Sequence, residues 1–111
     1  MATLYDLLKT KFAIKTRAVE NPLVTEVGTT AQLVLLNNPN RLGFVIQNLS
    51  TSADIYIGLD HTVSGTKGIK LAPGGSLSAV WDEDFEAVAW ARWGIASAAG
   101  SPIYILEVVS T

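Results

Sequence analysis

The segment from Asn40 to Gly58 most constrains the fold of this chain, because it reads as two β-strands joined by a polar turn. Leu42 to Gln47 is a run of β-branched and aromatic side chains, and Ile55-Tyr56-Ile57 is a second run that the glycine stops. Between them, Asn48 to Ser52 is rich in turn-forming residues. The segment predicts an antiparallel β-hairpin and contains no residue suited to catalysis.

Similar short runs recur along the chain, separated by Asn-, Gly- and Pro-containing turns. Residues 31–36 form an unbroken apolar run with one glutamine, which suits a strand buried on both faces. Residues 76–81 alternate between apolar and small polar side chains. About seven to eight short strands with such turns are typical of an all-β fold, an antiparallel β-sandwich or small jelly roll, with a closed barrel as the alternative. We expect this domain to span residues 21–111, after an N-terminal arm of residues 1–20.

The composition indicates more apolar surface than one small core can bury. Hydrophobic residues make up 49% of the 111 residues and charged residues only 16%, against an average near 25%, and the mean hydropathy is +0.32. No run approaches the ~18 apolar residues of a membrane-spanning helix. Charged residues from Asp6 to Lys15 interrupt any signal-peptide core. We therefore expect no membrane association, and a homo-oligomer or a part of a larger assembly.

The N-terminal arm is basic and the remaining body is acidic. Residues 1–17 hold four basic residues and one acidic residue (+3), whereas residues 18–111 hold four basic and nine acidic residues (−5). Leu4, Leu8 and Phe12 recur at a spacing of four behind a Thr3…Asp6 capping box, which is compatible with a short helix. Four scattered basic residues are a poor footprint for nucleic acid.

Two interpretations of the arm remain open. It is either a solvated terminus or a segment that docks on an acidic neighbour, such as another copy of the chain. The docking residues expected in the second case are Leu4, Leu8, Lys9, Lys11, Phe12, Lys15 and Arg17.

Residues 86–93 predict a strand whose two faces differ. Alternate positions carry small alanines on one face and larger side chains, including Trp90 and Arg92, on the other. The alanine face allows another backbone to approach closely, either within the core or at a subunit contact. The residues expected in such a contact are Ala87, Ala89, Trp90, Ala91, Arg92 and Trp93.

Residues with catalytic or metal-binding chemistry are sparse. The chain has one histidine, His61, and no cysteine, so a zinc shell cannot be assembled. No nucleophile elbow or phosphate-binding loop is present, and Asp82-Glu83-Asp84 lacks the spacing of a calcium loop. We expect no catalytic residue, no metal and no cofactor, and hence no enzyme.

Several features between residues 40 and 109 occur in a distinctive order. They are Asn40-Arg41 before a strand, Asn48 at its end, Ile55-Tyr56-Ile57-Gly58, the turn Leu71-Ala72-Pro73-Gly74-Gly75-Ser76, a late strand rich in alanine and aromatic residues, and Glu107-Val108-Val109. This order resembles that of small virion structural proteins of tailed bacteriophages. Residues 1–30 have no counterpart in the pattern.

The resemblance implies a capsid-associated β-sandwich, often arranged as trimers or other symmetric clusters. It leaves open whether the protein decorates the head, forms a head-fibre base or belongs to the tail. The expected function is that of a non-enzymatic virion protein, assembled in the host cytoplasm, that self-associates and binds the major capsid protein or another virion protein. The alternative is a carbohydrate- or receptor-binding module of a phage fibre or tail.

Overall fold

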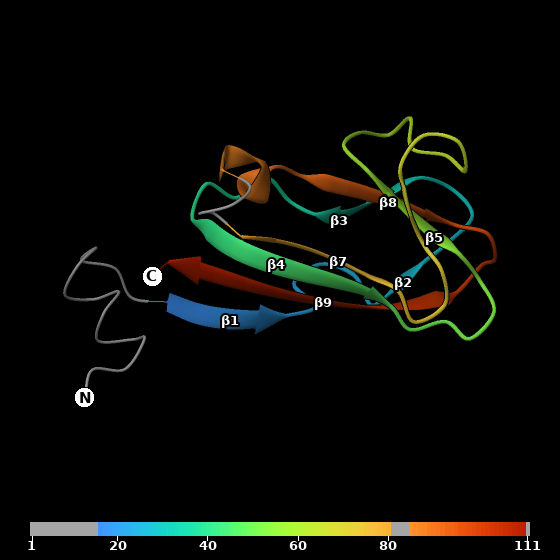
Figure 1. Cartoon of the computed structure of the whole chain (residues 1–111), viewed down its shortest axis with the longest axis horizontal. Helices are drawn as coiled ribbons and strands as arrows, with labels where there is room; N and C mark the ends of the chain where they lie inside the picture. The colour runs from blue at the N-terminus through green and yellow to red at the C-terminus, as the bar shows by residue number, and fades with distance from the viewer. Residues whose placement is uncertain (1–15, 81–84, 111) are drawn as a thin grey trace.

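A computed structural model describes residues 16–80 and 85–110. The described residues form nine strands and one short 3₁₀ helix (Figure 1). These elements are β1 (Thr16–Glu20), β2 (Glu26–Val27), β3 (Gln32–Leu35), β4 (Arg41–Asn48), β5 (Ile55–Gly58), β6 (Ile69–Leu71), β7 (Ser76–Val80), η1 (Phe85–Ala89), β8 (Arg92–Ala96) and β9 (Ser101–Ser110). No helix in this part of the chain has the length and apolar character needed to cross a membrane.

The strands form two antiparallel sheets that pack face to face. The first sheet has the order β1-β9-β4-β7, with β2 also paired to β9, and the second has the order β3-β8-β5-β6. Figure 1 shows the two layers, with η1 at the end where β4 begins and β9 finishes. The expected all-β sandwich is confirmed. Residues 16–20, placed in the arm by the sequence, form the edge strand β1.

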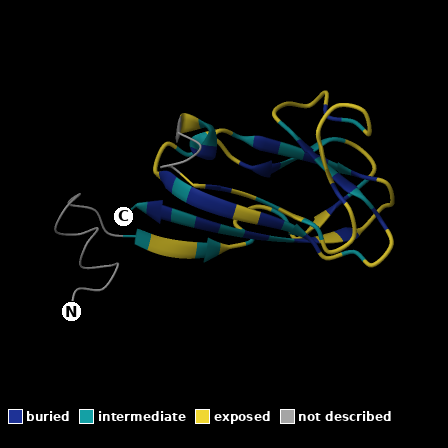
Figure 2. Cartoon of the chain, in the orientation of Figure 1, coloured by how far each residue is buried: buried dark blue, intermediate teal, exposed yellow. Residues whose placement is uncertain are grey.

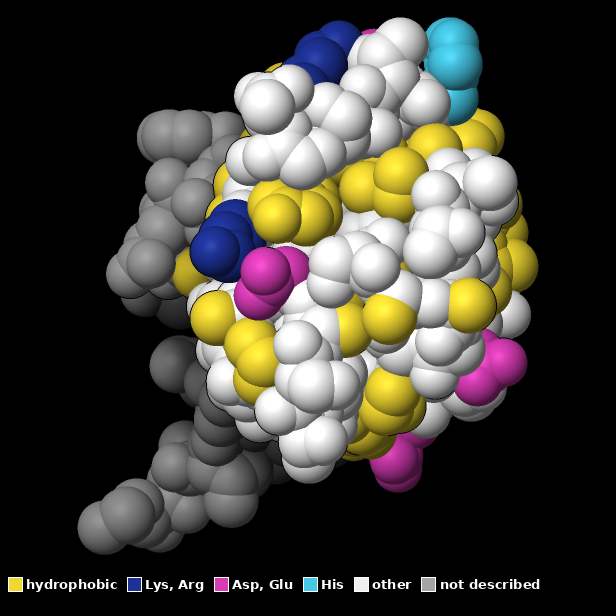
Figure 3. All heavy atoms as spheres, turned by 90° about the vertical axis from the view of Figure 1, so that its right-hand side faces the viewer, with side chains coloured by type: hydrophobic (Ala, Val, Ile, Leu, Met, Phe, Trp, Pro, Cys, Tyr) yellow, Lys and Arg dark blue, Asp and Glu magenta, His cyan; other side chains and the backbone are white. Residues whose placement is uncertain are grey.

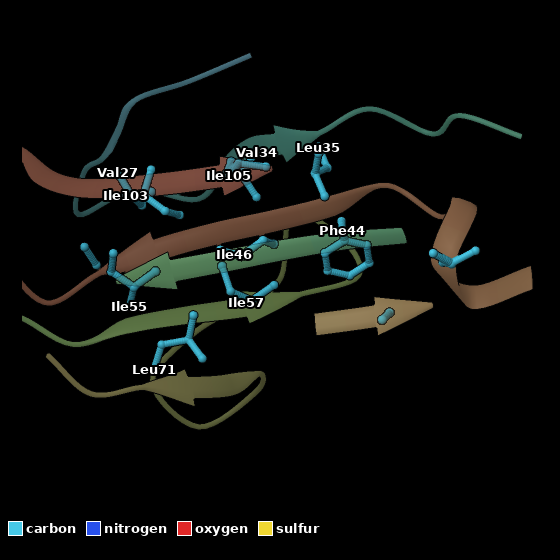
Figure 4. Close-up of a cluster of buried hydrophobic side chains, with 13 residues drawn as sticks. Val27, Val34, Leu35, Phe44, Ile46, Ile55, Ile57, Leu71, Ile103 and Ile105 are labelled. Carbon is cyan, nitrogen blue, oxygen red and sulfur yellow. The ribbon is translucent and has the colours of Figure 1, made fainter. Parts of the chain in front are cut away.

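The core lies between the layers and follows the two-residue period of the strands. Ile103 and Ile105 of β9, Ile46 of β4, and Ile55 and Ile57 of β5 are each 2% exposed or less and pack together (Figure 4). Figure 2 shows the same alternation as buried and partly exposed bands along β9 and β5. The apolar alternation read from the sequence therefore gives the inner faces of both sheets.

The predicted hairpin of residues 40–58 is wrong in one respect. Both strands form, but β4 lies in the first sheet and β5 in the second, so they do not pair with each other. Asn48, fully buried at the end of β4, holds this corner: its Nδ2 donates to the carbonyls of Ala53 and Leu71, both at 2.8 Å. The side-chain amide of Asn48 thus links the segments at the point where the chain passes from the first sheet to the second, in place of the backbone hydrogen bonds of a hairpin.

Two other strand expectations also need correction. The run at 31–36 forms β3 only over Gln32–Leu35, at the edge of the second sheet: Val34 and Leu35 are buried, whereas Leu36 follows the strand and is 55% exposed. The strand expected over residues 86–93 is replaced by η1 and then β8, which begins only at Arg92. In β7, by contrast, Ala79 is buried and the residues on either side of it are exposed, as the alternation predicts. Trp81, the last residue of that predicted run, lies outside the described residues.

Candidate interaction groove

An apolar groove of about 580 Å³ opens between the two sheets on the side of β7 and β6. Its floor includes the buried Phe44 and Ile57, and its rim carries Leu59, Ile69 and Trp90, which are 60%, 53% and 46% exposed. We call this feature the apolar groove. Its lining comes from four parts of the chain: Phe44 of β4, residues 57–69 around the β5–β6 loop, residues 77–79 of β7, and the η1–β8 segment with Ala87, Trp90 and Arg92.

The loop between β5 and β6 forms one wall of the apolar groove and is ordered by its own polar side chains. The Asp60 carboxylate accepts hydrogen bonds from the Thr62 hydroxyl and, at 2.9 Å, from the Thr62 backbone N–H. Lys67 donates to the same Thr62 hydroxyl and lies 3.7 Å from Asp60. The hydrogen bonds from Thr62 hold the pKa of Asp60 below its ordinary value, with the positive charge of Lys67 a smaller cause.

Close packing at Gly58 fixes the position of this loop over β5. A Cβ at Gly58 would lie 2.7 Å from Cγ2 and 2.8 Å from Cβ of Val63, which is itself buried. Only glycine allows Val63 to approach the strand this closely. The close packing of Val63 against Gly58 therefore holds the polar loop against β5.

The opposite wall of the apolar groove is η1, and two buried arginines hold it. Arg92 donates from Nη2 to the carbonyl of Ala87 at 2.7 Å, and its guanidinium lies 5.3 Å from the centre of the Phe44 ring. Arg41 donates from Nη1 to the carbonyls of Val88, Ala89 and Trp90 at 3.3, 3.5 and 3.4 Å. These bonds occupy carbonyls that a strand would place in a ladder, which explains why the run folds as a 3₁₀ turn and presents Trp90 at the rim.

Arg41 is itself neutralised within the protein. Its Nε lies 2.7 Å from Oε2 of Glu107, with the two side chains 2% and 8% exposed, and its Nη2 donates to the carbonyl of Leu36 at 2.6 Å. The ion pair links β4 to β9 while the remaining donors reach η1 and the end of β3. Its hydrogen bonds to several backbone carbonyls offset the cost of burying the guanidinium.

The structure brings together only part of the contact set predicted on the body. Ala87, Trp90 and Arg92 line the apolar groove, whereas Ala89 lines a second hollow of about 620 Å³ that shares Trp90. Trp93 points elsewhere: its ring makes an edge contact with the exposed His61, at a centroid distance of 6.2 Å. Ala91 lines neither hollow and is half-buried.

Most of the predicted arm residues lie outside the described residues. These are Leu4, Leu8, Lys9, Lys11, Phe12 and Lys15. Arg17 is exposed on β1, the edge strand separated from β7 by β9 and β4. The acidic turn Asp82-Glu83-Asp84 is also outside the described part.

Sequence reasoning missed Leu59 and Ile69 as rim residues. They flank a loop of mostly polar and small residues. The signal available in the sequence was this apolar side chain at each end of the loop. Figure 3 views the end of the molecule that carries this loop, where hydrophobic side chains reach the surface between polar ones, with His61 at the edge. Among the described residues, no three or more His, Cys, Asp or Glu side chains gather in a group able to hold a metal ion.

Comparisons with known proteins give only distant likenesses. No protein-family model and no curated protein matches the sequence. Among solved structures, the chain is similar to one described under "Bacillus endospore appendages form a novel family of disulfide-linked pili", with 14% identity, a TM-score of 0.49 and coverage of 88% of both chains. It is also similar to dTDP-4-dehydrorhamnose 3,5-epimerase from Bacillus anthracis, with 14% identity and a TM-score of 0.42, covering 98% of this chain but 62% of the epimerase. Neither likeness bears on what this chain binds or does.

Proposed function

We propose that this protein is a non-enzymatic structural subunit that self-associates, and that the apolar groove is its main contact. The observation that carries the proposal is the rim of the groove, where Leu59, Ile69 and Trp90 are all about half exposed or more. Exposed apolar clusters of this kind mark sites of protein association in soluble proteins. Tryptophan is also among the residues that contribute most to binding energy at protein interfaces.

Hydrogen bonds hold both walls of the groove in place, and a fixed surface favours binding. Arg41 and Arg92 fix the carbonyls of η1, and the Asp60–Thr62–Lys67 hydrogen bonds fix the opposite wall. A preformed contact surface loses less conformational entropy on association than a mobile one. Further apolar side chains lie outside the groove, including Leu36 and Val80 at 55% and 40% exposure, and they supply additional area for an assembly.

The finer proposal is a virion protein of the decoration type. It rests on the order of turns and strands from Asn40 to Val109, which resembles small virion proteins of tailed bacteriophages. In this role the chain binds a capsid lattice, through the major capsid protein or another virion protein, after assembly in the host cytoplasm. Symmetric clusters such as trimers would bury the rim residues of every copy.

Light scattering of the full chain over a range of concentrations tests the proposal. We expect self-association, and we expect Ile69→Lys, which places a charge on the rim, to weaken it by about tenfold or more, equivalent to about 1.4 kcal/mol. Leu49→Lys is the matched control, because Leu49 is similarly exposed but lies outside the groove lining. A chain that stays monomeric at high micromolar concentration would refute the proposal, and equal effects of the two variants would refute the groove as the contact.

A further inference from the structure

We infer that the apolar groove receives residues 4–12 of a second copy of this chain. The inference rests on the proposed self-association and names the segment that makes the contact. The occupant is suggested by three independent features: the apolar spacing of the segment, the distribution of charge, and the place where the described chain begins.

The apolar side chains of the segment match a groove between two sheets. Leu4, Leu8 and Phe12 recur every four residues, which places them on one face of a helix over about 12 Å. Such a helix is marginal by itself, because isolated helices shorter than about 12–15 residues are unstable in water. The groove offers a largely apolar lining with two buried side chains, Phe44 and Ile57, at its floor. An amphipathic helix in an apolar groove is a common recognition mode.

The charges around the groove suit a basic segment at one end. Residues 1–15 carry Lys9, Lys11 and Lys15 against a single acidic residue. Trp90 belongs both to the groove and to the neighbouring hollow that contains the exposed Glu86. Three further acidic residues, 82–84, directly precede η1 in the sequence. The opposite end is electrically balanced, because Asp60 and Lys67 pair there at 3.7 Å. The lysines of the segment therefore favour an orientation toward the Glu86 end.

The exit point of the chain favours delivery to another copy. Thr16 begins β1 and pairs with Ser110, at the edge of the first sheet farthest from β7. The strand runs from Thr16 toward Glu20, and Figure 1 shows that its first residue lies at the end of the sandwich. To reach its own groove, the segment would have to reverse direction and cross three strand spacings, about 14 Å. We therefore place the segment in the groove of a neighbouring copy.

Crosslinking of full-length chains tests this inference directly, since the native sequence has no cysteine. Leu8→Cys in a tagged chain is mixed with Ile69→Cys in an untagged chain, and a short bismaleimide is added. The matched control replaces the second partner by Leu49→Cys, which is as exposed but lies outside the groove lining. A third chain carries both Leu8→Cys and Ile69→Cys, and light scattering follows the association of every variant.

We expect a crosslinked dimer of tagged and untagged chains for the Ile69→Cys pair, at least tenfold more abundant than for the Leu49→Cys pair. Equal yields from the two pairs would overturn the inference. Crosslinking confined within single copies of the doubly substituted chain would overturn it as well, by showing that each groove holds its own segment. Association without a Leu8–Ile69 crosslink would remove the inference and leave the proposed self-association standing, whereas a monomeric chain would remove both.

Discussion

Arg41 and Glu107 form an ion pair across β4 and β9, with Nε and Oε2 2.7 Å apart and both side chains almost fully buried. The pair lies near the end of the sandwich that carries η1, and Arg41 also reaches the carbonyl of Trp90 on the groove rim. The position of a surface tryptophan therefore depends on a buried charge. Loss of either partner is expected to affect both the stability of the sheets and the shape of the groove.

Removing the carboxylate should be strongly destabilising. Glu107→Gln leaves the guanidinium of Arg41 buried without its counter-ion, which typically costs about 3–5 kcal/mol. Asp54→Asn is the control, since it breaks the Lys70–Asp54 pair at 3.7 Å, which lies partly exposed at the surface, and surface pairs contribute about 0–1 kcal/mol. Urea unfolding followed by circular dichroism gives both free energies. Similar losses of unfolding free energy for the two variants would show that the buried pair stabilises the protein no more than the surface pair does.

Adding one methyl group at Gly58 should displace the groove wall. In Gly58→Ala the new Cβ meets the branched carbon of Val63, which cannot rotate away, and overpacking of this kind costs about 1–3 kcal/mol. Gly28→Ala is the control, because its nearest contact would be an ordinary 3.7 Å. In a double-mutant cycle, Val63→Gly, which removes both the Cβ and the Cγ2 that clash, should relieve much of the Gly58→Ala penalty. A purely additive cycle would mean that the clash does not exist.

The corner at Asn48 should depend on its amide. Asn48→Ala leaves the buried carbonyls of Ala53 and Leu71 without their donor, and each unsatisfied buried group costs about 1–3 kcal/mol. Gln47→Ala, at the adjacent half-buried position of β4, should have a much smaller effect. Thermal unfolding of the two variants compares them. A melting temperature unchanged by Asn48→Ala would contradict the bridging role.

The pKa of Asp60 should report the order of the β5–β6 loop. Because hydrogen bonds from Thr62 lower this pKa below 3.8, the folded state favours the carboxylate. The resulting stabilisation is present above pH 3.8 and is lost as the pH falls through the lower folded pKa. Thr62→Val removes the hydroxyl donor and should raise the pKa, whereas Ser64→Ala should leave it low. Carboxyl carbon NMR titration measures both, and a pKa unaffected by Thr62→Val would disprove the assignment.

The two-residue period of the sequence predicts the layers well, because side-chain direction in a strand is a local property. In β9 the buried positions are Ser101, Ile103, Ile105, Glu107 and Val109, all in one phase. In the structure that phase places the carboxylate of Glu107 in the core, where a buried cation accompanies it. The identity of the cation, Arg41, depends on the pairing of β4 with β9, which brings together two residues 66 positions apart, and it could not be predicted from the local sequence.

Neither the groove nor η1 could be predicted from the local sequence, because both depend on contacts between distant parts of the chain. Residues 86–93 have strand-like composition, but hydrogen bonds from Arg41 and Arg92 to their carbonyls override that preference. Leu59, Ile69 and Trp90 meet at one rim only because the η1–β8 segment folds back beside the β5–β6 loop. Ala87, Trp90 and Arg92 of the predicted contact set line the groove, although the strand that suggested them does not form. Their part in a subunit contact stays a prediction.

The pairing of β9 sets the order in which the first sheet can be completed during synthesis. β1, β2 and β4 all hydrogen-bond to this strand, which begins about 80 residues after β1 ends. At translation rates of about 5–20 residues per second, β1 waits roughly 4–16 s for its partner to be made. During that interval β1 and β2 have no native neighbour in their sheet, whereas β4 can already pair with β7, so the first sheet is completed only when the final ten-residue strand has been made.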